Sequence, residues 1–143
     1  MKNSSHIKNL AISTLEIEAE AVSQLKKFIN DDFVDTILFI SKIKGRVIVT
    51  GIGKSAIIGQ KIVATFNSTG TPSIFMHASD AIHGDLGTIQ KDDAVICISK
   101  SGDTPELKIL IPLLKSFGNK LISIVGNSSS YLAKHSDFVL NTT

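Results

Sequence analysis

The 143-residue chain contains one cysteine, one arginine, one tyrosine and no tryptophan. The single cysteine, Cys97, excludes an internal disulfide and is typical of a reducing compartment. No run of about 18 apolar residues occurs, so the sequence predicts no membrane-spanning helix. Residues 1–10 are polar and lack the apolar core of a signal peptide, so we expect a cytoplasmic protein.

The scarcity of arginine bears on possible partners. Of the 15 basic residues, all but Arg46 are lysines, and they are spread along the chain. Bidentate phosphate clamps and base readout usually depend on arginine, and the chain has neither a basic run nor an aromatic platform. The net charge is only +2. These features argue against a nucleic-acid partner.

Chain length and apolar patterning predict one α/β domain. The 43% content of hydrophobic residues excludes disorder, and 143 residues suffice for a real core. Periodicity predicts helices at 7–28, 33–43, 54–67, 79–83, 105–117 and 128–134, and strands at 47–49, 73–76, 94–98, 121–125 and 138–140. This alternation predicts a three-layer sandwich around a five-stranded parallel sheet. No helix follows the last strand, so we expect part of one sheet face to be bare. Either a partner subunit or a further segment of a longer protein would cover it, and we favour the second.

The segment 95–106 is the most informative part of the chain. An apolar strand runs into a hydroxyl-rich turn, and Thr104 is placed to cap a helix that begins with proline. The N–H groups at the start of such a helix attract an anion. Ser99, Ser101 and Thr104 add hydroxyl donors, and Gly102 lets the backbone come close to a ligand. The segment therefore predicts a phosphate site.

A second loop, GIGKSA at 51–56, follows the first expected strand. It lacks the acidic residue of the dinucleotide fingerprint and the upstream glycine of a P-loop. Two interpretations remain: a glycine turn that packs a helix on a strand, or an anion pocket lined by Gly53, Lys54 and Ser55. Ligands of open α/β sheets bind beyond the carboxyl ends of the strands where the strand order reverses. We therefore expect both loops to face one cleft.

Two titratable side chains have alternative interpretations. Glu106, in the first turn of a helix, either complements the helix dipole or serves the site. His83 precedes a glycine-rich bend and either performs acid–base chemistry or simply ends a helix. The two histidines and two aspartates of segment 77–85 match no common metal-ligand spacing, so we expect no metal. Cys97 lies in an apolar strand, and we expect it to be inert.

Together these segments resemble the sugar isomerase (SIS) domain family. The general mark is the segment SKSGDTPE at 99–106, paired with GIGKS at 51–55. Within the family, arabinose-5-phosphate isomerases are the most similar group, on the motifs GIGKS, ATFNSTGTP (64–72) and HGDLG (83–87). The resemblance covers about residues 10–143.

The resemblance implies a flavodoxin-like fold, a homotetramer, no cofactor, and interconversion of D-ribulose 5-phosphate and D-arabinose 5-phosphate. This aldose–ketose isomerisation supplies the Kdo sugar of lipopolysaccharide. Lys54, His83 and Glu106 are the implied active-site residues, and Ser99, Ser101 and Thr104 the implied phosphate ligands.

Members of the family continue with a helix-bearing segment that supplies further active-site groups, and then with CBS modules. Residues 1–143 are therefore expected to be a SIS domain without its C-terminal part. Two alternatives remain open. One is a module that binds a sugar phosphate without turnover, and the other is a SIS isomerase of a different sugar phosphate.

Overall fold

Five short apolar segments form one parallel sheet in the computed structural model, which describes residues 3–143. The strands are β1 (Val47–Gly51), β2 (Ser73–His77), β3 (Ala94–Ser99), β4 (Leu121–Val125) and β5 (Phe138–Asn141). Their order is β2-β1-β3-β4-β5, so the order reverses between β1 and β3. Gly51 lies beside Ile98 in the register of these two strands. The loops that leave β1 and β3 therefore start at neighbouring points of the carboxyl edge, as predicted.

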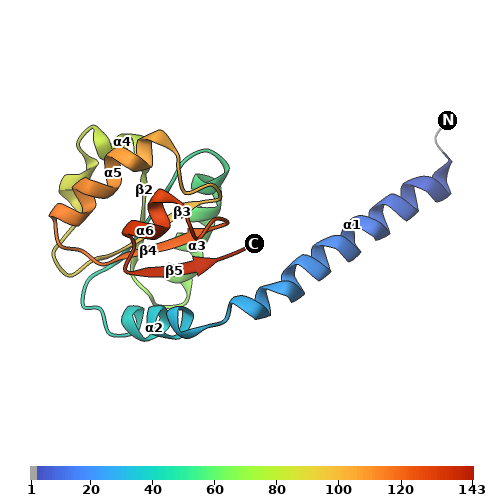
Figure 1. The fold of residues 1–143 in the computed structure, drawn as a ribbon, viewed down its shortest axis with the longest axis horizontal. Helices are drawn as coiled ribbons and strands as arrows, with labels where there is room; N and C mark the ends of the chain where they lie inside the picture. The colour runs from blue at the N-terminus through green and yellow to red at the C-terminus, as the bar shows by residue number, and fades with distance from the viewer. Residues whose placement is uncertain (1–2) are drawn as a thin grey trace.

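Helices cover both faces of the sheet (Figure 1), which confirms the three-layer prediction. One face carries α4 (Ala78–Ile82), α5 (Pro105–Ser116) and α6 (Tyr131–His135), and the other carries α2 (Asp31–Ile40) and α3 (Lys54–Ser68). Side chains of β3 alternate between the two cores: Val95 and Cys97 join the first, and Ile96 and Ile98 the second. Both faces of the central strand are therefore buried, as in other parallel sheets.

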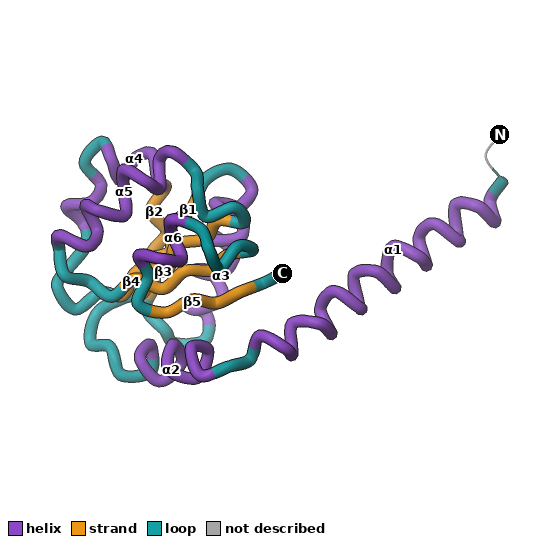
Figure 2. The backbone as a smooth tube through the Cα atoms, viewed as in Figure 1, coloured by secondary structure: helices purple, strands orange, loops and turns teal. Residues whose placement is uncertain are grey.

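The N-terminal helix stands outside this body. Helix α1 (Ser4–Gln24) is followed by a short 3-10 turn, Leu25–Phe28, and then by α2. The tube in Figure 2 shows α1 extending away from the sheet, and none of its residues is buried. None of the helices in the described part of the chain is long and apolar enough to span a membrane.

The sheet face beneath α2 and α3 is only partly covered at its edge, where Ile124 of β4 and Leu140 of β5 are half-buried. A groove of about 350 Å³ runs between the two helices and is almost entirely apolar. Its floor is formed by Ile96, Ile124 and Leu140, which come from β3, β4 and β5.

The single arginine, Arg46, forms an ion pair with the buried Asp93 at the amino edge of the sheet. Its Nη2 donates to Asp93 Oδ2 at 2.7 Å, and the backbone N–H groups of Arg46 and Gln90 donate to the same carboxylate. Burial alone would raise the pKa of Asp93, but these hydrogen bonds outweigh it, so the pKa is lowered. Arg46 is therefore structural and lies far from the carboxyl edge.

Candidate functional site

The hydroxyl-rich turn between β3 and α5 is shaped by its own hydrogen bonds. Ser99 Oγ accepts from the N–H of Gly102 at 3.0 Å and lies 3.3 Å from Thr104 Oγ1. Ser99 is only 5% exposed, whereas Ser101 is exposed and Thr104 half-buried. The Ser99 hydroxyl therefore organises the loop from inside, and Ser101 is the serine of this turn that faces solvent.

Gly102 fits a position that no side chain could share. Its φ is +69°, and a Cβ atom there would lie 2.1 Å from Ser130 Oγ. Ser130 caps α6 by accepting from the N–H of Ala133, and Leu132 donates its N–H to the Gly102 carbonyl at 3.0 Å. The tip of the turn is thus packed directly against the start of α6.

Asp103 makes a second contact with α6, and the sequence did not predict this contact. Its Oδ1 accepts from the N–H of Tyr131 at 3.2 Å and lies 3.4 Å from Lys108 Nζ. The available signal was the serine run at 128–130, which follows β4 at the same sheet edge. Asp103 therefore positions the turn from its outer side.

The start of α5 places a carboxylate beside the turn. Thr104 occupies the N-cap position, as predicted, but its hydroxyl meets Ser99 and makes no cap bond. Glu106 follows in the first turn of the helix, half-buried. Its Oε2 is buried and finds no hydrogen-bond partner among residues 3–143. Buried polar atoms are nearly always satisfied, so Glu106 Oε2 has accepting capacity left for a ligand.

The loop after β1 brings a second helix start to the same edge. Gly53 adopts φ +58° just before α3, whose N-terminus has no side-chain cap within the described chain. Lys54 begins the helix and is exposed, and Ser55 is half-buried. A Cβ on Gly51 would lie 3.1 Å from the Ile98 carbonyl, so glycine allows this loop to pack on the end of β3. Two helix N-termini, each an attractor of anions, therefore lie at the point where the strand order reverses.

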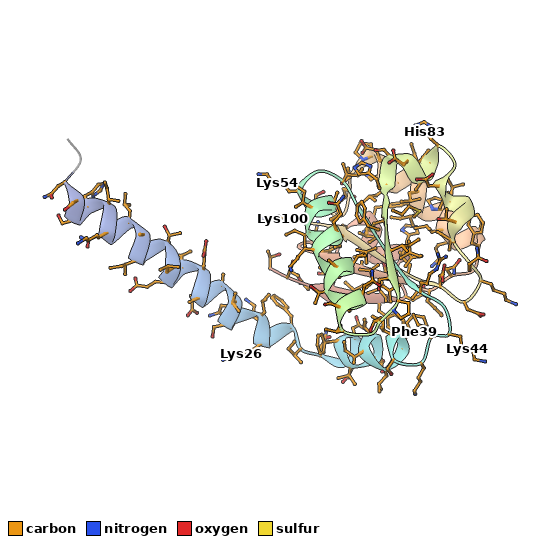
Figure 3. The ribbon with its side chains drawn as sticks, turned by 180° about the vertical axis from the view of Figure 1, so that it is seen from behind. Lys26, Phe39, Lys44, Lys54, His83 and Lys100 are labelled. Atoms are coloured by element: carbon orange, nitrogen blue, oxygen red, sulfur yellow. The ribbon has the colours of Figure 1, made fainter. Side chains whose placement is uncertain are left out.

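His83 does not join these residues within one chain. It is the exposed C-cap of α4, beyond the end of β2. Figure 3 shows Lys54 and Lys100 at one end of the body and His83 at another. The prediction that His83 ends a helix is confirmed.

The described residues offer neither a cluster of metal ligands nor an accessible thiol. Residues 3–143 contain no group of three or more histidine, cysteine, aspartate or glutamate side chains placed to hold a metal ion. Cys97 is fully buried in β3, and burial raises the pKa of its thiol to about 12. The prediction of an inert core cysteine is confirmed.

A separate hollow of about 270 Å³ lies at the opposite, amino edge of the sheet. Several of its walls are lysines, and Figure 3 shows Lys44 and Phe39 on that side of the body. It is lined by Phe39, Lys42, Ile43, Lys44, Lys91, Asp92, Asp93, Gly118, Asn119 and Lys120. This hollow is distinct from the two loops at the carboxyl edge.

A comparison with known protein families identifies the family to which this chain belongs. Residues 39–143 match the family model described as "SIS domain". The chain belongs to the SIS domain family. The motifs at 51–55 and 99–106, which form the two loops described above, both lie within the matched residues.

Curated relatives of this SIS domain have consistent names. It is 48% identical over 134 residues to the "probable arabinose 5-phosphate isomerase" of Haemophilus influenzae, covering 94% of this chain and 40% of that protein. It is also 48% identical over 130 residues to arabinose 5-phosphate isomerase KdsD of Pseudomonas aeruginosa, covering 91% and 40%. The chain therefore spans about 40% of the length of these relatives.

Solved structures share the SIS fold. An E. coli CFT073 protein, c3406, in complex with arabinose 5-phosphate superposes with a TM-score of 0.93 at 40% identity, covering 98% of this chain and 74% of that one. A "putative sugar-phosphate isomerase" from Listeria monocytogenes gives a TM-score of 0.91 at 37% identity, covering 96% and 73%. The expected fold class is thus confirmed.

Proposed function

We propose that this SIS domain holds the phosphate of a sugar phosphate between the loops after β1 and β3. Two helix starts without side-chain caps supply N–H donors and positive dipole ends. Ser101 and Thr104 add hydroxyls, and Gly53, Ser55 and Gly102 add backbone that can approach the ligand. Ser99 acts indirectly by fixing the turn.

We propose that the complete protein interconverts D-arabinose 5-phosphate and D-ribulose 5-phosphate. The relatives named above support this substrate pair, as does the solved structure with bound arabinose 5-phosphate. The names KdsD and KpsF among the relatives support a place in Kdo and lipopolysaccharide synthesis. We expect the enzyme to act in the cytoplasm as a homotetramer, without a cofactor.

The single observation that carries the catalytic proposal is the buried, unpartnered Oε2 of Glu106 beside the phosphate loop. Isomerisation requires a base that removes the proton from C2 of the aldose and returns it to C1 through an enediol(ate). Glu106 is the proposed base, while the hydroxyl proton on O2 is transferred to O1. The ammonium group of Lys54 would stabilise the negative charge that develops on the oxygen.

His83 has a more distant proposed role. Its exposed position apart from Lys54 allows it to meet a substrate held by another copy of the chain in the proposed homotetramer. There it would assist ring opening or orient a substrate hydroxyl.

The substitution Glu106→Gln in the complete protein tests the proposed base. The amide keeps the shape of the side chain but cannot accept the proton, so we expect turnover of arabinose 5-phosphate to fall by about 10²–10⁴-fold. Substrate affinity measured by calorimetry should stay within a few-fold. Glu20→Gln, on the exposed face of α1, is the matched control and should leave the rate unchanged. A Glu106→Gln enzyme with normal turnover would exclude Glu106 as the base.

A second candidate function is binding of a sugar phosphate without turnover. Its support is that the chain spans only about 40% of its curated relatives and keeps His83 apart from Lys54. Calorimetry and an isomerase assay on the same 143-residue sample separate the two functions. Binding without turnover favours this second function for the chain alone, and turnover of arabinose 5-phosphate excludes it. Turnover confined to another sugar phosphate would instead favour a different SIS isomerase.

A further inference from the structure

The amino-edge hollow, the space of about 270 Å³ at the amino edge of the sheet, lies where three strands begin. Its walls include the segments that lead into β1, β3 and β4, at residues 42–44, 91–93 and 118–120. Pockets for drug-sized ligands have about 300–1,000 Å³, so this hollow suits a smaller molecule. The five residues of β1 span about 16 Å, so a small ligand in the hollow does not reach the loops at the carboxyl edge.

Asn119 lines the amino-edge hollow with a hydrogen-bonding atom to spare. The residue is only 7% exposed, and its Nδ2 donates to the carbonyl oxygens of Gln90 at 2.9 Å and Asp93 at 2.8 Å. These two bonds fix the orientation of the amide, so Oδ1 points away from them. Asn119 Oδ1 is buried and has no hydrogen-bond partner among residues 3–143. Because buried polar atoms are nearly always satisfied, this oxygen has the capacity to accept a hydrogen bond from a ligand.

The lysines around the hollow carry more charge than their neighbours neutralise. Of the four lysines that line it, Lys120 pairs with Asp137 at 2.7 Å. The other three, Lys42, Lys44 and Lys91, form no ion pair within residues 3–143. Asp93 pairs with Arg46, so Asp92 is the acidic lining residue left to oppose these three lysines. The walls therefore have a surplus of two positive charges.

The ends of two helices lower this positive charge but do not cancel it. Helix α2 ends at Ile40 and α5 at Ser116, and residues just beyond them, Lys42 and Gly118, line the hollow. Each helix C-terminus is equivalent to about half a negative charge, so two ends offset about one lysine. Lys91 follows neither helix, so it does not serve to complement a helix end. The hollow therefore attracts an anion.

We propose that the amino-edge hollow is a second ligand site, which binds a small phosphate ester that carries a free hydroxyl group. The ammonium groups of Lys42, Lys44 and Lys91 bind the phosphate as compact point charges. The ligand hydroxyl donates to Asn119 Oδ1, and the half-buried side chain of Phe39 covers the carbon chain. None of the lining residues begins a helix, so we expect weaker binding than at the proposed phosphate site, where two helix starts supply N–H donors.

Titration of the ¹⁵N-labelled chain with sn-glycerol 3-phosphate, followed by NMR, tests this second site. We expect amide shifts at 42–44, 91–93 and 118–120, together with a shift of the side-chain NH₂ signal of Asn119. Ethyl phosphate carries no hydroxyl group beyond its phosphate, so it should shift the lysine segments and leave the Asn119 side-chain signal in place.

A pair of lysine variants tests the role of charge. Lys44→Gln/Lys91→Gln removes two charges from the hollow and should weaken binding of glycerol 3-phosphate there about fivefold or more. The matched control Lys8→Gln/Lys134→Gln removes the same charge from exposed positions on α1 and α6 and should keep the wild-type affinity. Any shifts at 53–55 and 101–106 report the proposed phosphate site and should be the same in both variants, so failure of one site is distinguishable from failure of the other.

Several results would overturn the second site. Shifts confined to 53–55 and 101–106, or no shifts at tens of millimolar glycerol 3-phosphate, would show that the hollow holds only water. Unchanged affinity in Lys44→Gln/Lys91→Gln would exclude the lysines as the phosphate ligands. An equal shift of the Asn119 side-chain signal with ethyl phosphate would show that the hollow recognises no hydroxyl group.

Discussion

Replacement of Gly102 by alanine tests how the phosphate loop is built. The added Cβ would lie 2.1 Å from Ser130 Oγ and 2.5 Å from Ser130 Cβ, at a φ of +69°. The left-handed backbone costs an L-residue about 1–2 kcal/mol, and overpacking costs about 1–3 kcal/mol more. We therefore expect Gly102→Ala to lower the free energy of unfolding by about 2–5 kcal/mol, the sum of these two costs, and to weaken sugar-phosphate binding with it.

Gly70→Ala is the matched control for this prediction. Gly70 also has a positive φ, +92°, but its Cβ would meet nothing within 4 Å, so only the backbone cost of about 1–2 kcal/mol applies. Urea unfolding followed by far-ultraviolet circular dichroism measures both variants. Equal losses for Gly102→Ala and Gly70→Ala would refute the packing of the turn against Ser130.

A double-mutant cycle isolates the contact itself. Ser130→Gly removes both atoms that the new Cβ would strike, and glycine at a helix cap costs only a few tenths of a kcal/mol. In the Ser130→Gly background, Gly102→Ala should therefore cost about 1–3 kcal/mol less than in the wild type. Additive losses would contradict the close approach of Gly102 to the start of α6.

Three further predictions follow from the site and the core. Ser101→Ala should mainly raise KM for the sugar phosphate, because this exposed serine is the proposed phosphate ligand; a collapse of kcat at constant KM would contradict that role. Lys54→Ala should lower turnover at least about tenfold, or about 1.4 kcal/mol of barrier, and an unchanged rate would remove Lys54 from the mechanism. The folded-state pKa of Asp93 is lowered, so its stabilising contribution should be complete above about pH 5 and disappear as the pH falls below about 4. Acid titration of stability in Asp93→Asn should lack this component, and an unaltered profile would contradict it.

Much of the fold could be predicted from local pattern. The five strands are short apolar runs, and a glycine or proline marks an end of β1, β2 and β4. Helix α5 continues through Pro112, as the predicted range 105–117 requires, and its buried residues Leu107, Leu110, Ile111 and Leu114 keep helical spacing on both sides of the proline. Packing of that face outweighs the one backbone hydrogen bond that proline removes. Helix α6 begins at Tyr131, three residues later than expected, because Ser130 caps it.

The site was predictable in location but not in detail. The glycine and serine motifs identified both loops, and the strand order brought them to one edge. The sequence could not show that the Ser99 hydroxyl turns inward, because the left-handed residue Gly102 sets the shape of the loop. Nor could it show the contact of Asp103 with Tyr131, which lies 28 residues further along the chain. Such side-chain directions depend on tertiary packing.

The most direct test of the phosphate site is a titration of the ¹⁵N-labelled chain with arabinose 5-phosphate, followed by NMR. The account predicts that the largest amide shifts occur at 53–55 and 101–106, and that arabinose without phosphate leaves 101–106 unshifted. Shifts confined to the lysine-lined hollow at the amino edge, at Lys42, Lys44 and Lys91, would contradict it.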